Sequence, residues 1–479
     1  MLMKLKKFYL IAALMAAPMA SFATDYYYVT PEGRGNGDGS SWDNAMSFDV
    51  VYGKINEFEN GDVFYLAGGT YYTPIVGITN GYTFIGGFNP ELKGTAHETP
   101  AYPSSTPTIF SGDTNRDGVM GEGDSDRLLA FRTDTKDDSK RVILTGLDFT
   151  CAYSVANTST HGALHVRNCG YVEVNNCRFY NNVDDKYYGG MAFTGDYSTV
   201  YFNDCEFTEN KAYSRGGAIR LSSNDKEKGV TVLNRCLIAD NEIQDNVGSA
   251  ICVQQGVSLY VINSTIVENV AGKVSGAIYS NGADGTYSRN VYIVNSTIAG
   301  NEGGPQVEMT DNANIYVANS IVVSNDDESA FSLKSVKTGM SGGMNILGSD
   351  ANGVLTLQDT DNIEAGNNYE KIFGSNELGA NGVIEPLADE GKYTASALAA
   401  ATADWGIEAD LTVDQTGAER ADGSTPGAYA KSTATGITGV EAVKGGADDA
   451  YYTLQGVKLG SRPTATGIYI HNGKKVIIR

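Results

Sequence analysis

The segments VEVNNCRFYNN (residues 172–182), VYFNDCEFTEN (200–210) and VLNRCLIADN (232–241) decide the fold of this chain. Each is a short apolar run that leads to a small residue, then to an apolar residue, and then to asparagine. Three later copies keep this order with serine as the small residue. The small residues are Cys177, Cys205, Cys236, Ser264, Ser296 and Ser320, separated by 28, 31, 28, 32 and 24 positions. Recurrence at such intervals is typical of a solenoid, which grows by stacking similar coils.

The apolar runs are rich in β-branched residues and are bounded by turn residues, so we predict strands. In a coil of about 29 residues each strand pairs in parallel with its equivalent one coil later, about 4.8 Å away. The asparagines then form one column, because asparagine tolerates left-handed turn conformations and stacked amides hydrogen-bond to each other. An antiparallel sandwich with turns every 8–12 residues does not explain such columns. The predicted column consists of Asn182, Asn210, Asn241, Asn269, Asn301 and Asn325.

A second recurring motif, Gly-Ala or Gly-Gly-Ala, precedes each new run, as at Gly216–Ile219, and allows a turn and close contact between walls. Cysteine occurs six times. Because Cys177, Cys205 and Cys236 hold equivalent repeat positions, we interpret them as a buried interior stack. No C-x-x-C spacing indicates a metal site.

The chain carries 35 basic and 57 acidic residues, a formal net charge of −22. This excess of negative charge argues against nucleic acid or an anionic membrane surface as the main partner. Residues 1–23 have a basic start, an apolar run and small residues before Thr24, which predicts a secretory signal peptide. The run is too short to span a membrane, and no later segment is long and apolar enough.

The predicted organisation is all-β, with a signal peptide (1–23), a parallel β-helix (24–430), a linker (431–450) and a small C-terminal β unit (451–479). Within the β-helix we expect a capping unit (24–100), a polar insertion (101–140), regular coils (141–325) and irregular C-terminal coils with a cap (326–430). Apolar spacing over residues 44–57 predicts a helix that covers the open end of the stack.

The motifs Phe179–Asn182 and Gly216–Ile219 resemble the repeats of chlamydial polymorphic outer-membrane proteins. More broadly, residues 25–430 resemble the pectin-lyase-like right-handed parallel β-helix proteins of Bacteroidetes, as in Tyr28–Trp42, Gly61–Tyr71 and Asp414–Tyr429. The resemblance implies a right-handed coil. It does not select a function, because such scaffolds host lyases, hydrolases, adhesins and passive surface rods.

Residues 451–479 contain a hairpin signal at Asn472-Gly473, a pair that fits a type I′ turn. This unit is similar to the C-terminal sorting domains of the Bacteroidetes type IX secretion route. The similarity implies recognition by the secretion machinery and delivery to the cell surface.

One polar loop has the oxygen-ligand spacing of a Ca²⁺ loop, although aspartate replaces the usual final glutamate and no clear helices flank it. A polar glycine/aspartate turn is the alternative, and any Ca²⁺ is expected to be structural. The candidate ligands are Asp113, Asn115, Asp117, Val119 and Asp124.

Loops before the Gly-Gly motif carry a second candidate site, for a glycan. Lys186 and Tyr213, and likewise Tyr188 and Arg215, stand 27 positions apart, so adjacent coils are expected to bring the four together. A cation beside a tyrosine can stack on and neutralise an acidic sugar, or support β-elimination. A solvated loop with ordinary cation–π contacts is the alternative that we favour over catalysis.

The His161-Gly162 pair echoes polygalacturonase-like hydrolases but lacks the neighbouring carboxylate pair that hydrolysis needs, so His161 and His165 are interpreted as wall residues. We therefore expect a secreted, surface-delivered protein with a binding, adhesion or structural role, towards glycans or cell surfaces. The alternative is a polysaccharide lyase or glycoside hydrolase. Either function is expected in the loops 183–189, 211–216 and 221–229, because the column residues maintain the stack.

Overall fold

The computed structural model describes residues 24–431, except 75, 156–161, 187–189, 191, 224–228, 282–288, 325–328, 364–368, 375, 380–381 and 388–390, together with 451–452, 459, 467–471 and 474–478. The predicted signal peptide and the linker after residue 431 lie outside the described residues. The chain forms two compact units, Met1–Thr433 and Ala434–Arg479.

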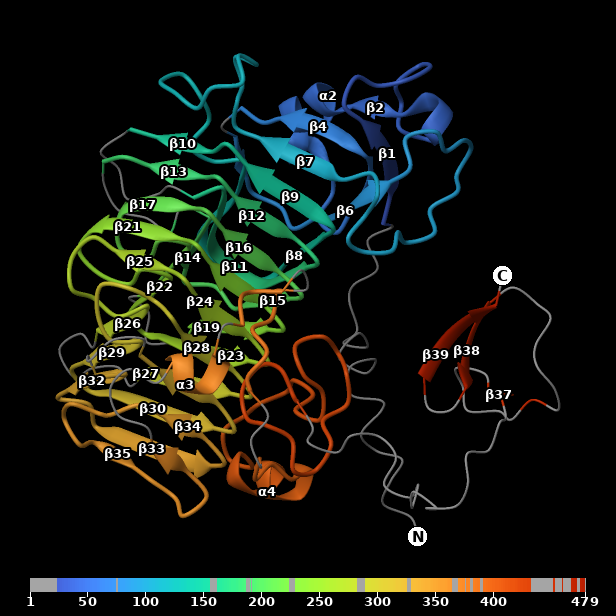
Figure 1. Cartoon of the computed structure of the whole chain (residues 1–479). Helices are drawn as coiled ribbons and strands as arrows, with labels where there is room; N and C mark the ends of the chain where they lie inside the picture. The colour runs from blue at the N-terminus through green and yellow to red at the C-terminus, as the bar shows by residue number, and fades with distance from the viewer. Residues whose placement is uncertain are drawn as a thin grey trace, which may run out of the picture. The chain divides into compact units, whose positions relative to one another are not determined.

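The first unit is a coiled stack of parallel strands in three sheets, of which sheet A has 20 described strands (Figure 1). Every strand pair within these three sheets is parallel, as predicted. Sheet A contains β1 (Tyr26–Thr30), β2 (Met46–Ser47), β3 (Val63–Ala67), β5 (Gly77–Ile78), β6 (Thr83–Phe88), β8 (Leu129–Thr145), β11 (Leu164–Asn175), β14 (Phe193–Asp196), β15 (Val200–Asn203), β18 (Ile219–Ser223), β19 (Gly229–Asn234), β22 (Ile251–Gln255), β23 (Val257–Ile262), β26 (Ile278–Asn281), β27 (Arg289–Val294), β29 (Val307–Thr310), β30 (Ala313–Ala318), β32 (Phe331–Lys334), β33 (Thr338–Gly343) and β35 (Leu355–Thr356).

Sheet B follows sheet A around each coil and faces the viewer in Figure 1, and the short sheet C follows sheet B. Sheet B contains β4 (Gly69–Tyr72), β7 (Thr108–Ser111), β9 (Leu147–Thr150), β12 (Arg178–Tyr180), β16 (Glu206–Thr208), β20 (Leu237–Ala239), β24 (Thr265–Val267), β28 (Thr297–Ala299), β31 (Ile321–Val323), β34 (Ile346–Leu347) and β36 (Asn362–Ile363). Sheet C contains β10 (Tyr153–Ser154), β13 (Val183–Asp184), β17 (Lys211–Ser214), β21 (Glu242–Asp245) and β25 (Val270–Ala271).

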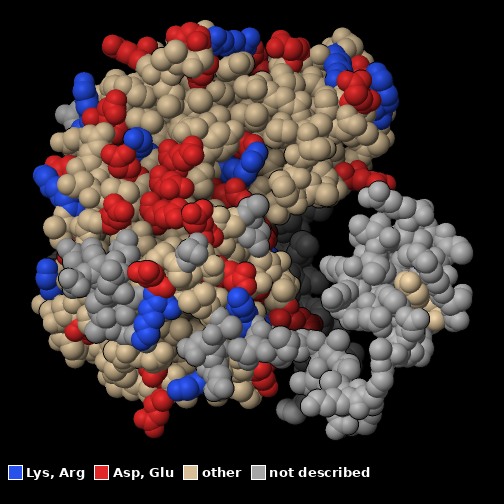
Figure 2. Space-filling model, viewed as in Figure 1, with Lys and Arg blue, Asp and Glu red and all other residues tan. Residues whose placement is uncertain are grey.

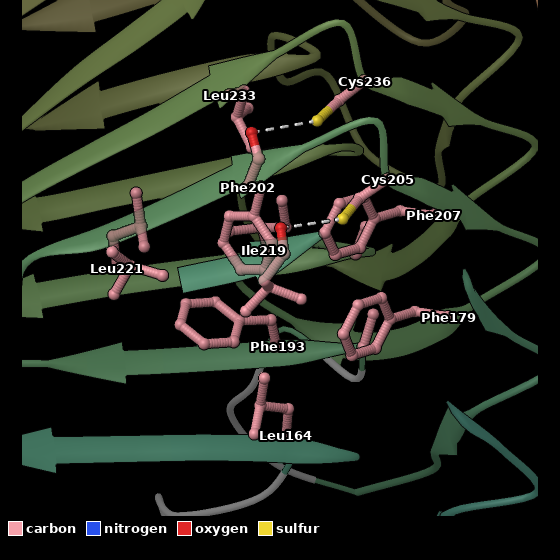
Figure 3. Packing of buried hydrophobic residues seen from close by; sticks show 14 of the residues in the cluster. Leu164, Phe179, Phe193, Phe202, Cys205, Phe207, Ile219, Leu221, Leu233 and Cys236 are labelled. Carbon is pink, nitrogen blue, oxygen red and sulfur yellow. Dashed lines mark hydrogen bonds between the residues drawn. The ribbon is translucent and has the colours of Figure 1, made fainter. Parts of the chain in front are cut away.

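Identical register positions fill the interior of the stack with like side chains. The rings of Phe149, Phe179 and Phe207 stack with centroids 4.6 and 4.8 Å apart. Beside them the thiol of Cys205 donates to the carbonyl of Val174, and Figure 3 shows Cys205 and Cys236 in equivalent places. The predicted interior column of small residues is confirmed, since Cys177, Cys205, Cys236, Ser264, Ser296 and Ser320 are all buried.

The interior thiols are expected to be chemically inert in the folded protein. Burial raises the pKa of Cys177 to about 12 and raises that of Cys205 well above its usual value, so almost no reactive thiolate forms at neutral pH. A disulfide reagent such as DTNB should leave these thiols unmodified in the native protein and modify them after denaturation. Rapid modification of Cys205 under native conditions, located by mass spectrometry, would contradict this prediction.

The asparagine column is also confirmed, and it forms a continuous buried ladder. The Asn210 side-chain amide donates to Asn241 Oδ1 at 2.9 Å, and Asn241 donates to Asn269 Oδ1 at 2.9 Å. One part of the prediction is wrong, because the ladder residues do not adopt the left-handed conformation. The residue before each of them does, as at Glu209 (φ 57°) and Asp240 (φ 56°). The asparagine side-chain amide forms the hydrogen bonds of the turn, and the residue before it adopts the left-handed conformation that changes the chain direction. Asn325 lies outside the described residues.

The N-terminal region contains the helix α2 (Phe48–Gly53) between two 3₁₀ turns, Trp42–Asn44 and Ile55–Glu57. Ser47 Oγ accepts a hydrogen bond from the backbone N–H of Val50 and so begins the helix. Phe48 packs on Phe110 inside the stack, with ring centroids 5.3 Å apart. The segment 101–140 is not a polar insertion throughout, because β7 and much of β8 belong to the sheets. Their apolar residues alternate too briefly to stand out beside the long polar loop between them.

The coils end near β36, and the chain then returns along sheet B as residues 369–431, here called the return segment. It includes α3 (Tyr369–Phe373) and α4 (Ala395–Ala401). Thr265 Oγ1 donates to Gln415 Oε1 at 2.5 Å, and the Ala428 N–H donates to Thr297 Oγ1 at 3.0 Å. The return segment is thus fastened to the outer face of β24 and β28.

The second unit contains β37 (Tyr451–Tyr452), β38 (Gly467–His471) and β39 (Lys474–Ile478), joined as an antiparallel sheet. The turn pair Asn472-Gly473 lies outside the described residues. Among the helices that the structure describes, none has the length and apolar character needed to cross a bilayer.

Candidate functional site

A groove of about 210 Å³ crosses the outer face of sheet B between a loop around Tyr102 and the return segment. Polar side chains from consecutive coils line its floor. The Tyr102 hydroxyl donates to the carbonyl of Gly86 at 2.9 Å and fixes one wall, whereas Gln415 belongs to the other. The lining residues are Tyr102, Pro103, Ser104, Pro107, Gly146, Asp148, Asn176, Arg178, Asp204, Cys205, Glu206, Arg235, Leu237 and Gln415.

The floor of the groove is a ladder of charged residues on β9, β12 and β16. Strand register places Asp148 and Glu206 on either side of Arg178. Arg178 forms a bidentate pair with Asp148, in which Nε donates to Oδ1 at 2.9 Å and Nη2 donates to Oδ2 at 2.5 Å. This contact raises the pKa of Arg178. Its side chain is still 43% exposed, so the remaining N–H groups are accessible to a ligand.

A second pair of the same kind lies at the turn between sheets A and B. Arg235 holds Asp204 through Nε to Oδ1 at 2.7 Å and Nη2 to Oδ2 at 2.6 Å. Both residues adopt left-handed backbone conformations, with φ 55° and 55°. The two planar guanidinium–carboxylate pairs therefore present fixed donors and acceptors to the groove.

Glu206 is the third carboxylate of the floor. Its side chain reaches solvent, yet the groove walls desolvate it enough to raise its pKa, and Arg178 opposes this shift while Asp148 adds to it. Desolvation in the groove thus favours the protonated form of Glu206 more than in free solution.

The ladder changes character where the return segment begins. The positions equivalent to Glu206 in the next coils are Leu237, Thr265 and Thr297, all buried. Leu237 packs with α3 and Ile384 of the return segment, and the two threonines bond to it. The groove is therefore the stretch of sheet B that the return segment leaves uncovered.

The four candidate glycan-binding residues can be placed only in part. Tyr188 lies outside the described residues, and Lys186 is exposed after β13. The pairing of β13 with β17 joins Val183 to Lys211, an offset of 28 rather than the 27 on which the shared column was predicted. Tyr213 is half-buried on β17, and Arg215 reaches Gln254 Oε1 at 3.4 Å, on sheet A. Glycan binding by these four residues stays a prediction, and it concerns the loops and not the groove.

Close to Arg215 lies a buried polar cluster on the outer face of sheet A. His165 is fully buried, and its Nε2 lies 3.6 Å from Asp196 Oδ2, while Arg220 Nη1 lies 3.6 Å from Asp196 Oδ1. Burial lowers the pKa of His165 despite this carboxylate. His165 thus lies in the wall, as interpreted from the sequence. His161 is outside the described residues.

In the candidate Ca²⁺ loop the carboxylates accept backbone N–H groups. Asp113 Oδ2 accepts from Gly118 at 3.0 Å, and Asp117 Oδ1 accepts from Val119 at 2.8 Å. Asp124 Oδ2 accepts from Gly121, and Asn115 donates to Asp117. Over the described part of the chain, no three His, Cys, Asp or Glu side chains converge as metal ligands. Ca²⁺ binding by this loop stays a prediction.

Beside the groove, the turn between sheets B and C carries a column of carboxylates, Glu209, Asp240 and Glu268, each before a ladder asparagine. Figure 2 shows acidic side chains gathered on this face. Desolvation and then Glu209 raise the pKa of Asp240, and desolvation, Asp240 and Glu377 raise that of Glu268. These carboxylates are thus held close together against mutual repulsion.

Replacing Glu268 with glutamine is expected to stabilise the protein at pH 7. A carboxyl group with a raised pKa binds its proton more tightly in the folded state, so its ionisation costs stability above the folded pKa. The gain should be about 0.3 kcal/mol, the size of one surface like-charge contact, and should vanish below the unfolded value of about 4.3. Thermal melts from pH 3 to 8 measure it, with exposed Glu302→Gln as the control. A less stable Glu268→Gln variant at pH 7 would contradict the prediction.

A family model described as a right-handed beta helix region matches residues 162–369, which include the strands of the groove floor from β12 onwards. The first unit of the chain has the right-handed parallel β-helix fold. A sequence search of curated proteins found no match for this β-helix.

Among solved structures, the β-helix is similar to the pectate lyase Pel9A, with a TM-score of 0.37 and 12% identity over 86% of this chain and 98% of that one. It is also similar to tailspike protein 3 of bacteriophage CBA120, with a TM-score of 0.30 and 11% identity over 70% of this chain and 59% of that one.

The groove residues escaped the sequence predictions, although a signal for them exists. Asp148, Arg178 and Glu206 follow directly after the same turn in successive coils of the β-helix, and Asp204 and Arg235 precede the small residue. In later coils, the residues that directly precede and follow the small residue are uncharged. That change marks where the outer face passes from solvent to the return segment.

Proposed function

We propose that this chain is an exported glycan-binding protein that holds a polysaccharide in the sheet B groove. The observation that carries the proposal is the pair of guanidinium–carboxylate forks, Arg178–Asp148 and Arg235–Asp204, on the floor of an open groove. Fixed, paired donors and acceptors suit the hydroxyl groups of sugars.

Binding to a panel of immobilised polysaccharides tests this function. Arg178→Ala and Arg235→Ala together should weaken binding of any captured polymer at least about tenfold, or about 1.4 kcal/mol. The matched control is Lys211→Ala, which removes an exposed cation paired with Glu242 at 2.7 Å on sheet C. Full binding by the double groove variant, or no binding of any polysaccharide by the native protein, would refute the proposal.

A second candidate function is glycoside hydrolysis or elimination in the same groove. Glu206, with its raised pKa, is the candidate proton donor, and Asp148 is a carboxylate two strands away, about 10 Å at the backbone. The Glu206→Gln variant should then retain polymer binding and lose the release of new reducing ends or unsaturated products. Equal turnover by native protein and variant would remove Glu206 from this role.

Surface delivery is part of the proposal and rests on the sequence of residues 1–23 and 451–479. Deletion of residues 451–479 should leave the protein inside the cell envelope, as judged by protease accessibility on whole cells. Unchanged surface display would refute a sorting role for this unit.

A further inference from the structure

The cations in the groove are already neutralised by the protein itself. Each guanidinium uses its Nε and Nη2 on a neighbouring carboxylate, at distances of 2.5–2.9 Å. Arg178 and Arg235 therefore offer N–H donors to a ligand but little uncompensated positive charge. A ligand carboxylate would have to compete with Asp148 and Asp204 for them.

The groove carboxylate without such a bidentate partner is Glu206. Its register neighbours are Arg178 on one strand and Leu237 on the other. Arg178 lowers the pKa of Glu206 by attraction, but desolvation outweighs this effect. The floor thus holds three carboxylates against two guanidinium groups, with Glu206 exposed to whatever enters the groove.

The surface next to the groove is also acidic. The column of Glu209, Asp240 and Glu268 lies at the corner that follows β16, β20 and β24, and the whole chain carries a formal charge of −22. A polyanion that approached the groove would meet like charge at both its floor and its edge. Juxtaposed like charges at an interface cost several kcal/mol, whereas an ammonium group beside Glu206 would be attracted.

We infer that the groove selects an amine-bearing glycan, such as a glucosamine polymer, with its ammonium group at Glu206, over neutral and then uronate polymers. This inference rests on the proposed glycan-binding function. The free N–H groups of Arg178 and Arg235 then donate hydrogen bonds to sugar hydroxyl groups, and Glu206 determines which ligand charge is preferred.

Calorimetric titration of the full chain at neutral pH and low salt tests the preference. The probes are oligomers of glucosamine, N-acetylglucosamine and galacturonic acid, all of equal length. The glucosamine oligomer is expected to bind about tenfold more tightly than the galacturonate oligomer. Glu206→Gln should lower this ratio, with the acidic edge accounting for what remains, while Glu242→Gln, at an exposed glutamate on sheet C, should leave it unchanged.

The outcomes separate the two proposals. Tighter binding of the galacturonate oligomer, or an unchanged ratio in Glu206→Gln, overturns the charge preference while leaving glycan binding intact. Binding weakened at least about tenfold in the Arg178→Ala, Arg235→Ala double variant confirms that the groove is the site measured. Absence of binding by every oligomer refutes the charge preference, and absence of binding across the polysaccharide panel refutes the proposed function.

Discussion

Replacing Asn241 with alanine is expected to destabilise the β-helix by on the order of 4 kcal/mol, because several buried polar groups lose their partners at once. Asn241 Nδ2 donates to the carbonyls of Phe207 and Ala239, and Asn241 Oδ1 accepts from both the backbone and the side-chain amide of Asn210. Alanine leaves these groups buried without a substitute. Water cannot reach them, because Asn241 is 1% exposed.

The matched control is Asn203→Ala. Asn203 belongs to a second stack of asparagines, in which its amide donates to Asn175 Oδ1 at 3.0 Å, but it lies on the outer surface and is half-buried. Water can replace its hydrogen bonds, so its loss should cost less than about 1 kcal/mol. Urea unfolding at fixed pH measures both variants. Equal losses in the two would show that stacking, and not burial of the amide, gives the ladder its strength.

Replacing Arg420 with methionine is expected to detach the return segment and to cost on the order of 3 kcal/mol. The Arg420 guanidinium is buried and donates to the carbonyls of Val413 at 3.0 Å and Gly427 at 2.6 Å within the return segment. It also reaches the carbonyl of Asn295 in the stack at 3.5 Å. Burial lowers its pKa to about 10, so it remains charged at neutral pH. Methionine fills much of the same volume but satisfies none of these carbonyls.

Hydrogen exchange and limited proteolysis of residues 391–431 measure the detachment. The Lys93→Met variant, which removes an ion pair with Asp43 on the surface, is the control and should change nothing measurable. Because Gln415 forms part of the groove wall, Arg420→Met should also weaken glycan capture. Protection of residues 391–431 at the native level in Arg420→Met would contradict the role of Arg420 as the fastening.

The periodic part of the structure was predictable from the sequence because every coil has the same turn and needs the same residue types there. Cys205 and Asn210 recur at fixed places since every coil must pass the same turn with the same buried carbonyls. Spacing alone therefore gave the parallel pairing and the interior stack. It misplaced the left-handed residue by one position, because both Glu209 and Asn210 tolerate that turn and only the geometry decides between them.

The groove was not predictable in the same way, because it is built from parts far apart in the chain. Its walls come from Tyr102 and Gln415, and its floor from Arg178 and Arg235. No local pattern shows that residues after 369 turn back over sheet B instead of extending the stack. The loop residues were predicted from a spacing of 27 positions between coils, whereas β13 and β17 pair with an offset of 28.

The path of the return segment has a consequence for the time course of folding. Coils can form one upon another through short-range contacts, but the bond between Thr265 and Gln415 joins residues 150 positions apart. Contacts of such long sequence separation close slowly, after the intervening coils exist to receive them. The groove is therefore the last part of the β-helix to be completed. A chain still being synthesised carries no complete groove, so the glycan binding that we propose would begin only after the return segment has docked.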